Sequence, residues 1–150
     1  MSRNGRPCLL SLLQPNKSFQ GVTSTYKRPL SMKAAELFIR CLENEGVEYV
    51  FGIPGEENLD VMDALLDSSI HFITVRHEQG AAFMADVYGR LTERAGVCLA
   101  TLGPGATNLI TGVADANMDH APLVAIAGQA GTNRLHKESH QVLDLTNLFE

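Results

Sequence analysis

Residues 96–105 read Gly-Val-Cys-Leu-Ala-Thr-Leu-Gly-Pro-Gly, an apolar run that ends in a turn of glycine and proline. An uninterrupted apolar run of roughly 4–8 residues, bounded by turn residues, is typical of a strand buried on both faces of a parallel sheet. Residues 106–117 follow with apolar side chains at helical spacing. The stretch therefore predicts one strand–loop–helix unit of an α/β sheet.

The same alternation of strand and helix patterns extends in both directions from this unit. Short connections between such segments indicate parallel strands joined by helical crossovers. We therefore predict an α/β fold, a three-layer doubly wound parallel sheet with helices on both faces. The expected strands are residues 48–53, 72–75, 96–101 and 123–127, and the expected helices are residues 34–44, 58–66, 78–92 and 106–117.

The ends of the chain differ from its middle. Residues 1–31 contain Ser and Pro, show no sustained periodicity and carry five basic residues with no acid. This composition fits either a flexible extension or an organelle-targeting leader, and both remain open. Residues 32–150 form the predicted domain, and an amphipathic helix begins near residue 142. Because the chain stops inside that pattern, we expect the domain to be truncated at its C-terminal end.

The charge of the predicted domain excludes one class of function. The whole chain has a formal net charge of −5 and residues 1–31 contribute +5, so residues 32–150 carry −10. Nucleic-acid surfaces depend on clustered Lys and Arg, which makes a nucleic-acid partner unexpected. No apolar run approaches the roughly 20 residues that span a membrane, so we expect no membrane segment.

Cysteine usage indicates a reducing compartment. Cys8, Cys41 and Cys98 are far apart and form no CxxC pair, a pattern typical of reduced thiols in a cytoplasmic protein. Cys41 and Cys98 lie in apolar runs. Free cysteine is among the most buried residue types, so both are predicted to pack in the core.

Four loops are expected to carry the ligand chemistry, because open parallel sheets bind ligands beyond the carboxyl ends of their strands. These loops are residues 52–58, 76–82, 102–108 and 127–129. The third contains Gly-Pro-Gly, which lets the backbone approach a flat ligand closely. It lacks the Gly-Lys-Ser/Thr and GxGxxG patterns of phosphate loops.

Glu78 is the strongest single candidate for catalysis. It opens the helix predicted after the second strand, and Gln-Gly-Ala-Ala follows it. A carboxylate in a first helical turn interacts favourably with the helix dipole, which is worth only about 0.3–1 kcal/mol. The small residues after it allow close packing that shuts water away, and a carboxylate in a dry site can exchange protons near neutral pH. Both roles remain open from the residues alone.

Metal and serine-triad sites find little support in the sequence. His77 and His120 have no histidine partner at ligand spacing, and His136 and His140 lie on a predicted loop without a third ligand nearby. No GxSxG elbow is present.

Four motifs in order resemble one known family. The motifs are Val-Phe-Gly-Ile-Pro-Gly at 50–55, Arg-His-Glu-Gln-Gly-Ala-Ala-Phe-Met-Ala-Asp-Val-Tyr-Gly-Arg at 76–90, Gly-Pro-Gly-Ala-Thr-Asn at 103–108 and Ala-Pro-Leu-Val at 121–124. With these motifs, the chain from residue 32 to residue 150 resembles the N-terminal, pyrimidine-binding domain of thiamine-diphosphate enzymes, and within them the acetolactate synthase branch.

The resemblance implies an activity and a catalytic residue. Glu78 matches the family's glutamate that hydrogen-bonds N1′ of the cofactor's aminopyrimidine ring. The implied reaction is decarboxylation of a 2-oxo acid such as pyruvate, followed by joining to a second 2-oxo acid to give 2-acetolactate.

The resemblance also assigns further site residues. Pro104 and Asn108 match positions that line the pyrimidine pocket. Pro54 and Gly55 match the loop near the reacting carbon. Gln141 falls where family members often carry a glutamine that reaches toward cofactor and substrate.

Partners follow from the same resemblance. The family holds the diphosphate and its Mg²⁺ in a separate C-terminal domain, through a Gly-Asp-Gly segment that this chain does not contain. The pyrimidine domain of one subunit faces the diphosphate domain of another. A homodimer or higher homo-oligomer is therefore implied, and we expect the 150-residue chain to be inactive alone.

Two departures from the family pattern leave alternatives open. Glu56 and Glu57 stand where small residues are usual, and His140 stands where phenylalanine is common before Gln141. We interpret the two glutamates as solvent-exposed acids at a helix start. A related decarboxylase or carboligase remains an alternative to acetolactate formation, as does a non-catalytic dimerisation or regulatory module.

Overall fold

The computed structural model describes residues 31–135 and 137–150, so residues 1–30 of the predicted extension lie outside the described residues. The domain from Met32 onward is built on a four-stranded sheet with the strand order β2-β1-β3-β4. All three neighbouring pairs are parallel. The strands are β1 (Tyr49–Gly52), β2 (His71–Thr74), β3 (Gly96–Ala100) and β4 (Leu123–Ala127).

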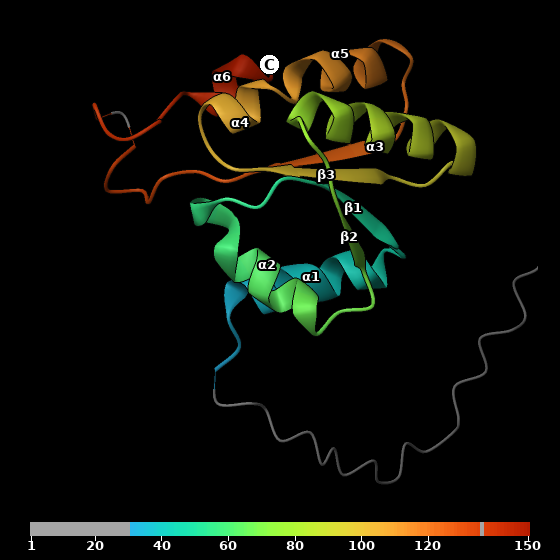
Figure 1. Ribbon diagram of the computed structural model, residues 1–150, viewed down its shortest axis with the longest axis horizontal. Coiled ribbons are helices and arrows are strands. Elements are labelled where there is room, and N and C mark those ends of the chain that lie inside the picture. The colour runs from blue at the N-terminus through green and yellow to red at the C-terminus, as the bar shows by residue number, and fades with distance from the viewer. Residues whose placement is uncertain (1–30, 136) are drawn as a thin grey trace, which may run out of the picture. The chain divides into compact units, whose positions relative to one another are not determined.

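Helices cover both faces of this sheet, as Figure 1 shows. Helices α1 (Ala34–Asn44) and α2 (Leu59–Leu66) lie on one face, and α3 (Glu78–Thr92) and α5 (Ile110–Met118) lie on the other. The predicted three-layer doubly wound architecture is therefore confirmed. Three short helices complete the described chain: η1 (Glu56–Asn58), α4 (Pro104–Thr107) and α6 (Leu145–Leu148).

The core consists of two clusters, one on each side of the sheet. Alternate strand residues face opposite sides, so Val50 and Leu99 pack with Leu65 of α2, whereas Phe51 and Cys98 pack against α3. Every residue of β3 is buried. A fully buried Leu or Val contributes about 1.5–3 kcal/mol, so this central strand anchors both layers.

Small residues bring α3 close to its neighbours. Ala81, Ala82 and Ala85 are fully buried. A Cβ built on Gly112 of α5 would lie only 2.5 Å from the Cβ of Ala82, so the two helices meet at van der Waals contact. The tight packing expected after Glu78 is confirmed.

An ionic cluster joins the other end of α3 to α5. Arg90 pairs with Asp86 at 2.8 Å, with Asp115 at 2.8 Å and also with Asp119. The hydrogen bond to Asp86, together with the Asp119 carboxylate, raises the pKa of the Arg90 guanidinium above its usual range. Because Asp86 is only 1% exposed, its charge requires this arginine.

Two predicted helices differ from those observed. The helix expected over residues 106–117 is divided into α4 and α5, because Pro104 starts a helix earlier and its hydrogen-bond pattern tightens at Leu109, whose amide bonds to the Ala106 carbonyl. The helix expected near residues 142–149 is limited to α6. Asp144 caps α6 by accepting a hydrogen bond from the Asn147 amide.

Some predicted core residues are exposed. The helical spacing of Leu59, Met62, Leu65 and Leu66 predicts one shared apolar face on the helix of residues 58–66. In the structure Leu66 is 82% exposed and Leu59 is 58% exposed. Cys41 is also exposed, so the prediction of a buried Cys41 is wrong, whereas Cys98 is buried as predicted. α1 turns Ile39 and Leu42 into the core, which leaves Cys41 on its outer side.

The two cysteines are expected to differ in reactivity. Burial raises the pKa of the Cys98 thiol to about 12, and the thiolate is the reactive form. A disulfide reagent at pH 8 should therefore modify Cys41 quickly and Cys98 only on unfolding. The measurement is a thiol titration of a Cys8→Ser variant with and without denaturant. Two fast thiols in the native protein would contradict this expectation.

No helix of the described residues is long and apolar enough to cross a bilayer.

Candidate functional site

The candidate site lies where the chain reverses its direction of travel across the sheet. β2 is on one side of β1, while β3 and β4 follow on the other side, so the switch point lies between β1 and β3. Ligands of open α/β sheets bind beyond the carboxyl ends of the strands at this point. The loops that follow Gly52 and Ala100 therefore border the expected crevice.

Glu78 stands at this edge as the first residue of α3. His77 precedes it with extended backbone and accepts a hydrogen bond from the Gln79 amide at 3.2 Å through Nδ1, which fixes the start of the helix. The Glu78 side chain is buried, with 9% of the residue exposed.

Asn108 meets Glu78 from the neighbouring loop. Its Nδ2 donates a hydrogen bond to Glu78 Oε2 at 2.9 Å. The two residues are 30 positions apart in sequence, and the pairing orients the carboxylate. The structure therefore brings together two of the residues that the resemblance assigned.

Glycine leaves space beside the second oxygen of Glu78. A Cβ built on Gly105 would stand 3.4 Å from Glu78 Oε1 and 2.9 Å from Thr101 Cγ2. A side chain at position 105 would therefore crowd Thr101 and touch Glu78 Oε1. One oxygen of Glu78 is held by Asn108 while the other faces a glycine surface.

Thr101 is a site residue that the sequence analysis missed. It directly follows β3, and a Cβ on Gly55 would be only 2.5 Å from its Cβ. The Thr101 side chain thus fills the space between Gly55 and Gly105. The Gly-Pro-Gly motif indicated a close approach of the backbone, but nothing in the sequence showed that a threonine occupies the space.

Glu57 differs from its prediction as a solvent-exposed acid. It is half-buried, and its Oε2 accepts a hydrogen bond from Thr101 Oγ1 at 3.1 Å. Glu56 is exposed, as predicted. The two adjacent glutamates therefore have different surroundings, and only Glu57 contacts the candidate site.

Asn58 holds the loop that carries Pro54 and Gly55. It is 3% exposed, and its Oδ1 accepts a hydrogen bond from the Gly55 amide at 2.8 Å. Gly55 reaches Thr101 at the switch point, whereas Pro54 is exposed. A cofactor role for either residue stays a prediction.

Gln141 and Pro104 do not join the Glu78–Asn108 pair in this structure. The Gln141 side chain is exposed, and its backbone, at φ 52°, is left-handed. A Cβ on Gly103 would lie 2.6 Å from the Gln141 carbonyl oxygen, so the backbone of the loop meets the turn before α4. Pro104 is exposed at the first position of α4.

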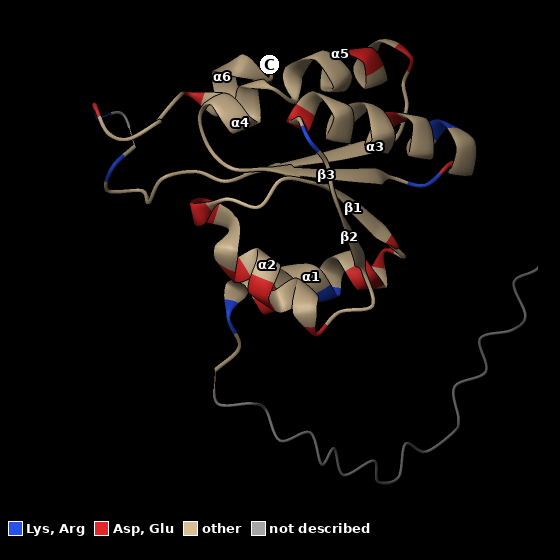
Figure 2. Cartoon of the chain, in the orientation of Figure 1, with Lys and Arg blue, Asp and Glu red and all other residues tan. Residues whose placement is uncertain are grey.

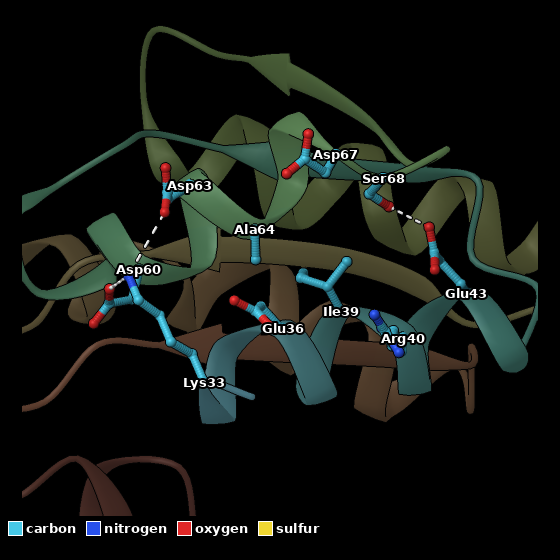
Figure 3. A pocket seen from close by; sticks show the side chains of 10 residues that line it. All are labelled: Lys33, Glu36, Ile39, Arg40, Glu43, Asp60, Asp63, Ala64, Asp67 and Ser68. Carbon is cyan, nitrogen blue, oxygen red and sulfur yellow. Dashed lines mark hydrogen bonds and ion pairs between the residues drawn. The ribbon is translucent and has the colours of Figure 1, made fainter. Parts of the chain in front are cut away.

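A separate cavity lies between α1 and α2, on the outside of the domain (Figure 3). It has a volume of about 280 Å³ and is lined mainly by charged side chains. Lys33 pairs with Asp60 at 3.0 Å across its rim, and hydrogen bonds from Ser68 and Ser69 lower the pKa of Glu43. None of the switch-point residues lines this cavity.

The distribution of charged and metal-ligating side chains limits the chemistry that the described residues can carry out. Acidic residues occur on the helices of both faces in Figure 2. Among the described residues, no group of three or more His, Cys, Asp or Glu side chains is arranged to hold a metal ion.

A doubly wound sheet with a buried carboxylate, an orienting amide and a glycine surface at its switch point defines a ligand-binding α/β domain suited to a flat ring. Residues 32–148 match the family described as thiamine pyrophosphate enzyme, N-terminal TPP binding domain. The chain belongs to this family, which confirms the predicted resemblance. Thiamine pyrophosphate is another name for thiamine diphosphate.

Relatives of the chain agree with this assignment. It is 48% identical over 118 residues to a probable acetolactate synthase large subunit of Methanocaldococcus jannaschii, covering 79% of this chain and 20% of that protein. It is 47% identical over 128 residues to the acetolactate synthase of Bacillus subtilis, covering 85% and 22%. A catabolic acetolactate synthase of Raoultella terrigena is 50% identical over 115 residues, covering 77% and 21%. The chain thus spans about a fifth of the length of these relatives.

The residues at the switch point fit the aminopyrimidine part of the cofactor. A ring nitrogen needs one hydrogen-bonding carboxyl oxygen, and Glu78 Oε1, which borders Gly105, can supply it. The described residues offer no comparable ligand set for a divalent metal.

Proposed function

We propose that this chain forms the pyrimidine-binding wall of a thiamine-diphosphate enzyme that decarboxylates a 2-oxo acid such as pyruvate and joins the remaining acyl unit to a second carbonyl compound. The observation that carries the proposal is the buried Glu78 carboxylate, oriented by Asn108 at 2.9 Å at the switch point. When the second compound is also pyruvate, the product is 2-acetolactate, in keeping with the names of the relatives.

Each residue of the site has a proposed part in this function. The bound cofactor would supply a stabilised carbanion equivalent, which the protein side chains cannot provide themselves. Glu78 would hold and move a proton at ring nitrogen N1′ through Oε1. Asn108 fixes the carboxylate in place, and Gly105 keeps the ring face accessible.

The remaining predicted site residues have supporting parts. Gly55 and Pro54 would border the reacting carbon, and Pro104 would close the pocket beside Gly105. Gln141 would act from the loop that contacts Gly103. We further propose that Mg²⁺ and the diphosphate are held outside the described residues, by a domain of the kind that the family resemblance implies.

The direct test is turnover by the full-length protein, by which we mean this chain joined to the proposed diphosphate-binding domain. With thiamine diphosphate and Mg²⁺ present, the protein should release carbon dioxide from pyruvate, and omission of thiamine diphosphate should abolish the release. The measurement is coupled carbon dioxide detection with product identification by mass spectrometry. A folded protein that binds thiamine diphosphate yet consumes none of a panel of 2-oxo acids would refute the enzymatic proposal.

We also propose a homodimer in which a second copy covers α3. The outer face of this helix presents Met84, Val87 and Leu91, which are 42%, 49% and 80% exposed. With Phe83 and Tyr88 they line a continuous and almost wholly apolar surface depression. Contiguous exposed apolar surfaces of this kind typically mark sites of association.

The dimer proposal predicts a difference between two equally exposed leucines. Leu91→Glu should raise the dissociation constant of the dimer by about 10–100-fold, because a charge would be buried at the contact. Leu66→Glu is the matched control, since Leu66 is 82% exposed on the opposite face. Light scattering across a dilution series measures both. Equal self-association of the two variants would count against α3 as the contact.

A further inference from the structure

A second carboxylate stands over the strand ends beside the proposed cofactor site. Glu57 is half-buried, and its Oε2 accepts a hydrogen bond from Thr101 Oγ1 at 3.1 Å. A Cβ built on Gly128, just after β4, would lie 3.2 Å from the Glu57 Cβ. Glu57 therefore spans from the loop after β1 to the carboxyl ends of both β3 and β4.

Thr101 lies between this carboxylate and the surroundings of Glu78. Its hydroxyl faces Glu57, while its methyl group faces Gly105, the glycine that also borders Glu78 Oε1. One threonine side chain thus contacts Glu57 on one side and borders the Gly105 surface on the other. A molecule bound at these strand ends beside Thr101 would meet the field of Glu57.

Among the described residues, no cation forms an ion pair with Glu57. The Thr101 hydroxyl is a neutral donor, so it orients the carboxylate without cancelling its charge. An anion brought beside a half-buried carboxylate experiences repulsion that water screens only in part.

We propose that Glu57 is a specificity-determining residue that disfavours an anionic second substrate, so that the acyl unit is passed preferentially to a neutral aldehyde. This inference rests on the proposed function and narrows its second substrate. Specificity of this kind comes from an unfavourable interaction with the competing ligand.

The two substrates differ in how they experience this charge. The first 2-oxo acid loses its carboxylate as carbon dioxide, so the repulsion from Glu57 is relieved as the reaction proceeds. A second 2-oxo acid would keep its carboxylate through the entire carbon–carbon bond formation. An aldehyde carries no such charge.

The proposed step balances without an added oxidant or reductant. The bond between the carbonyl carbon and the carboxylate of the 2-oxo acid breaks, and carbon dioxide leaves. The electron pair left on the carbonyl carbon forms a bond to the aldehyde carbon. One proton from the medium is taken up by the aldehyde oxygen, and the product is a 2-hydroxy ketone.

The test compares two glutamate-to-glutamine variants of the full-length holoenzyme. Glu57→Gln removes the charge and keeps an oxygen that can accept the Thr101 hydrogen bond. Glu43→Gln is the matched control, because Glu43 is also half-buried and accepts a serine hydroxyl hydrogen bond at 2.7 Å, on α1. Pyruvate is the first substrate, and pyruvate and benzaldehyde compete as second substrates.

We expect Glu57→Gln to raise the ratio of 2-acetolactate to hydroxy ketone by about tenfold, a change of the size that one partly screened charge produces. Glu43→Gln should leave the ratio unchanged. A readout without turnover is the calorimetric affinity for oxamate, an unreactive isostere of a 2-oxo acid, which Glu57→Gln should raise by a similar factor.

The outcomes separate this inference from the proposed function. If the unaltered holoenzyme consumes no 2-oxo acid, the proposed function fails, and the oxamate measurement still judges Glu57. If turnover occurs but neither the product ratio nor the oxamate affinity changes in Glu57→Gln, the role of Glu57 is overturned and the proposed function stands. Should Glu57→Gln fold poorly, Glu57→Ala is measured under the same criteria.

Discussion

Replacement of Glu78 by glutamine is expected to lower kcat of the full-length protein by about 10²–10⁴-fold, the usual range for loss of a positioned proton-transfer group. Glutamine is nearly the same size and can still pair with Asn108, so the packing of α3 should not change. What is lost is the exchangeable proton at Oε1. The measurement is steady-state carbon dioxide release at saturating thiamine diphosphate and Mg²⁺.

The control for Glu78→Gln is the same substitution at Glu93, an exposed glutamate at the opposite end of α3. It should retain full turnover, and both variants should share the thermal unfolding midpoint of the unaltered protein. Turnover of Glu78→Gln within about threefold of the unaltered protein would refute proton transfer by Glu78, since even a weak general acid contributes more than that.

The sequence predicted the regular elements well where local pattern and burial agree. The bounds predicted for α1, α3 and β4 match the structure to the residue, and the other strands differ by a single residue at one or both ends. These elements carry strong periodicity or uninterrupted apolar runs. The predicted edge loops also contain Glu78 and Asn108, which the fold brings together.

The remaining errors arise where contacts distant in sequence decide the outcome. Leu65 is buried and Leu66 is exposed because α2 turns only one of its sides toward the core. Two adjacent leucines in the sequence do not indicate which of them lies on that side. Glu57 looks like any acid at a helix start until Thr101, which is 44 residues away, donates to it. A single sequence contains no signal for such a pairing.

The arrangement of the site also depends on contacts that the motifs do not specify. Gly-Pro-Gly predicted a sharp turn, and Gly103 does adopt a left-handed φ of 60°. The motif could not show that this turn packs against the Gln141 backbone and Cβ. The exposed position of the Gln141 side chain is therefore a finding of the structure alone.

The second large expected effect concerns the packing of α3 on β3. A Cβ built on Gly96 would lie 1.9 Å from the carbonyl oxygen of Ala85 and 2.9 Å from its Cα. Both atoms belong to the backbone of α3, so neither can rotate away as a flexible side chain could. Gly96→Ala therefore requires a shift of the helix, and we expect the free energy of unfolding to fall by about 2–4 kcal/mol.

Gly80→Ala is the matched control. Gly80 lies on α3, and a Cβ built there meets nothing within 4 Å. There the substitution should raise the free energy of unfolding by about 0.5–1 kcal/mol through lower unfolded-state entropy. Urea denaturation of the two variants measures both changes, and a loss of stability at Gly80 as large as at Gly96 would contradict the packing described. Since Glu78 is the first residue of the displaced helix, Gly96→Ala should also weaken its pairing with Asn108. Turnover should therefore also fall when it is measured without urea, at a temperature where the variant remains folded.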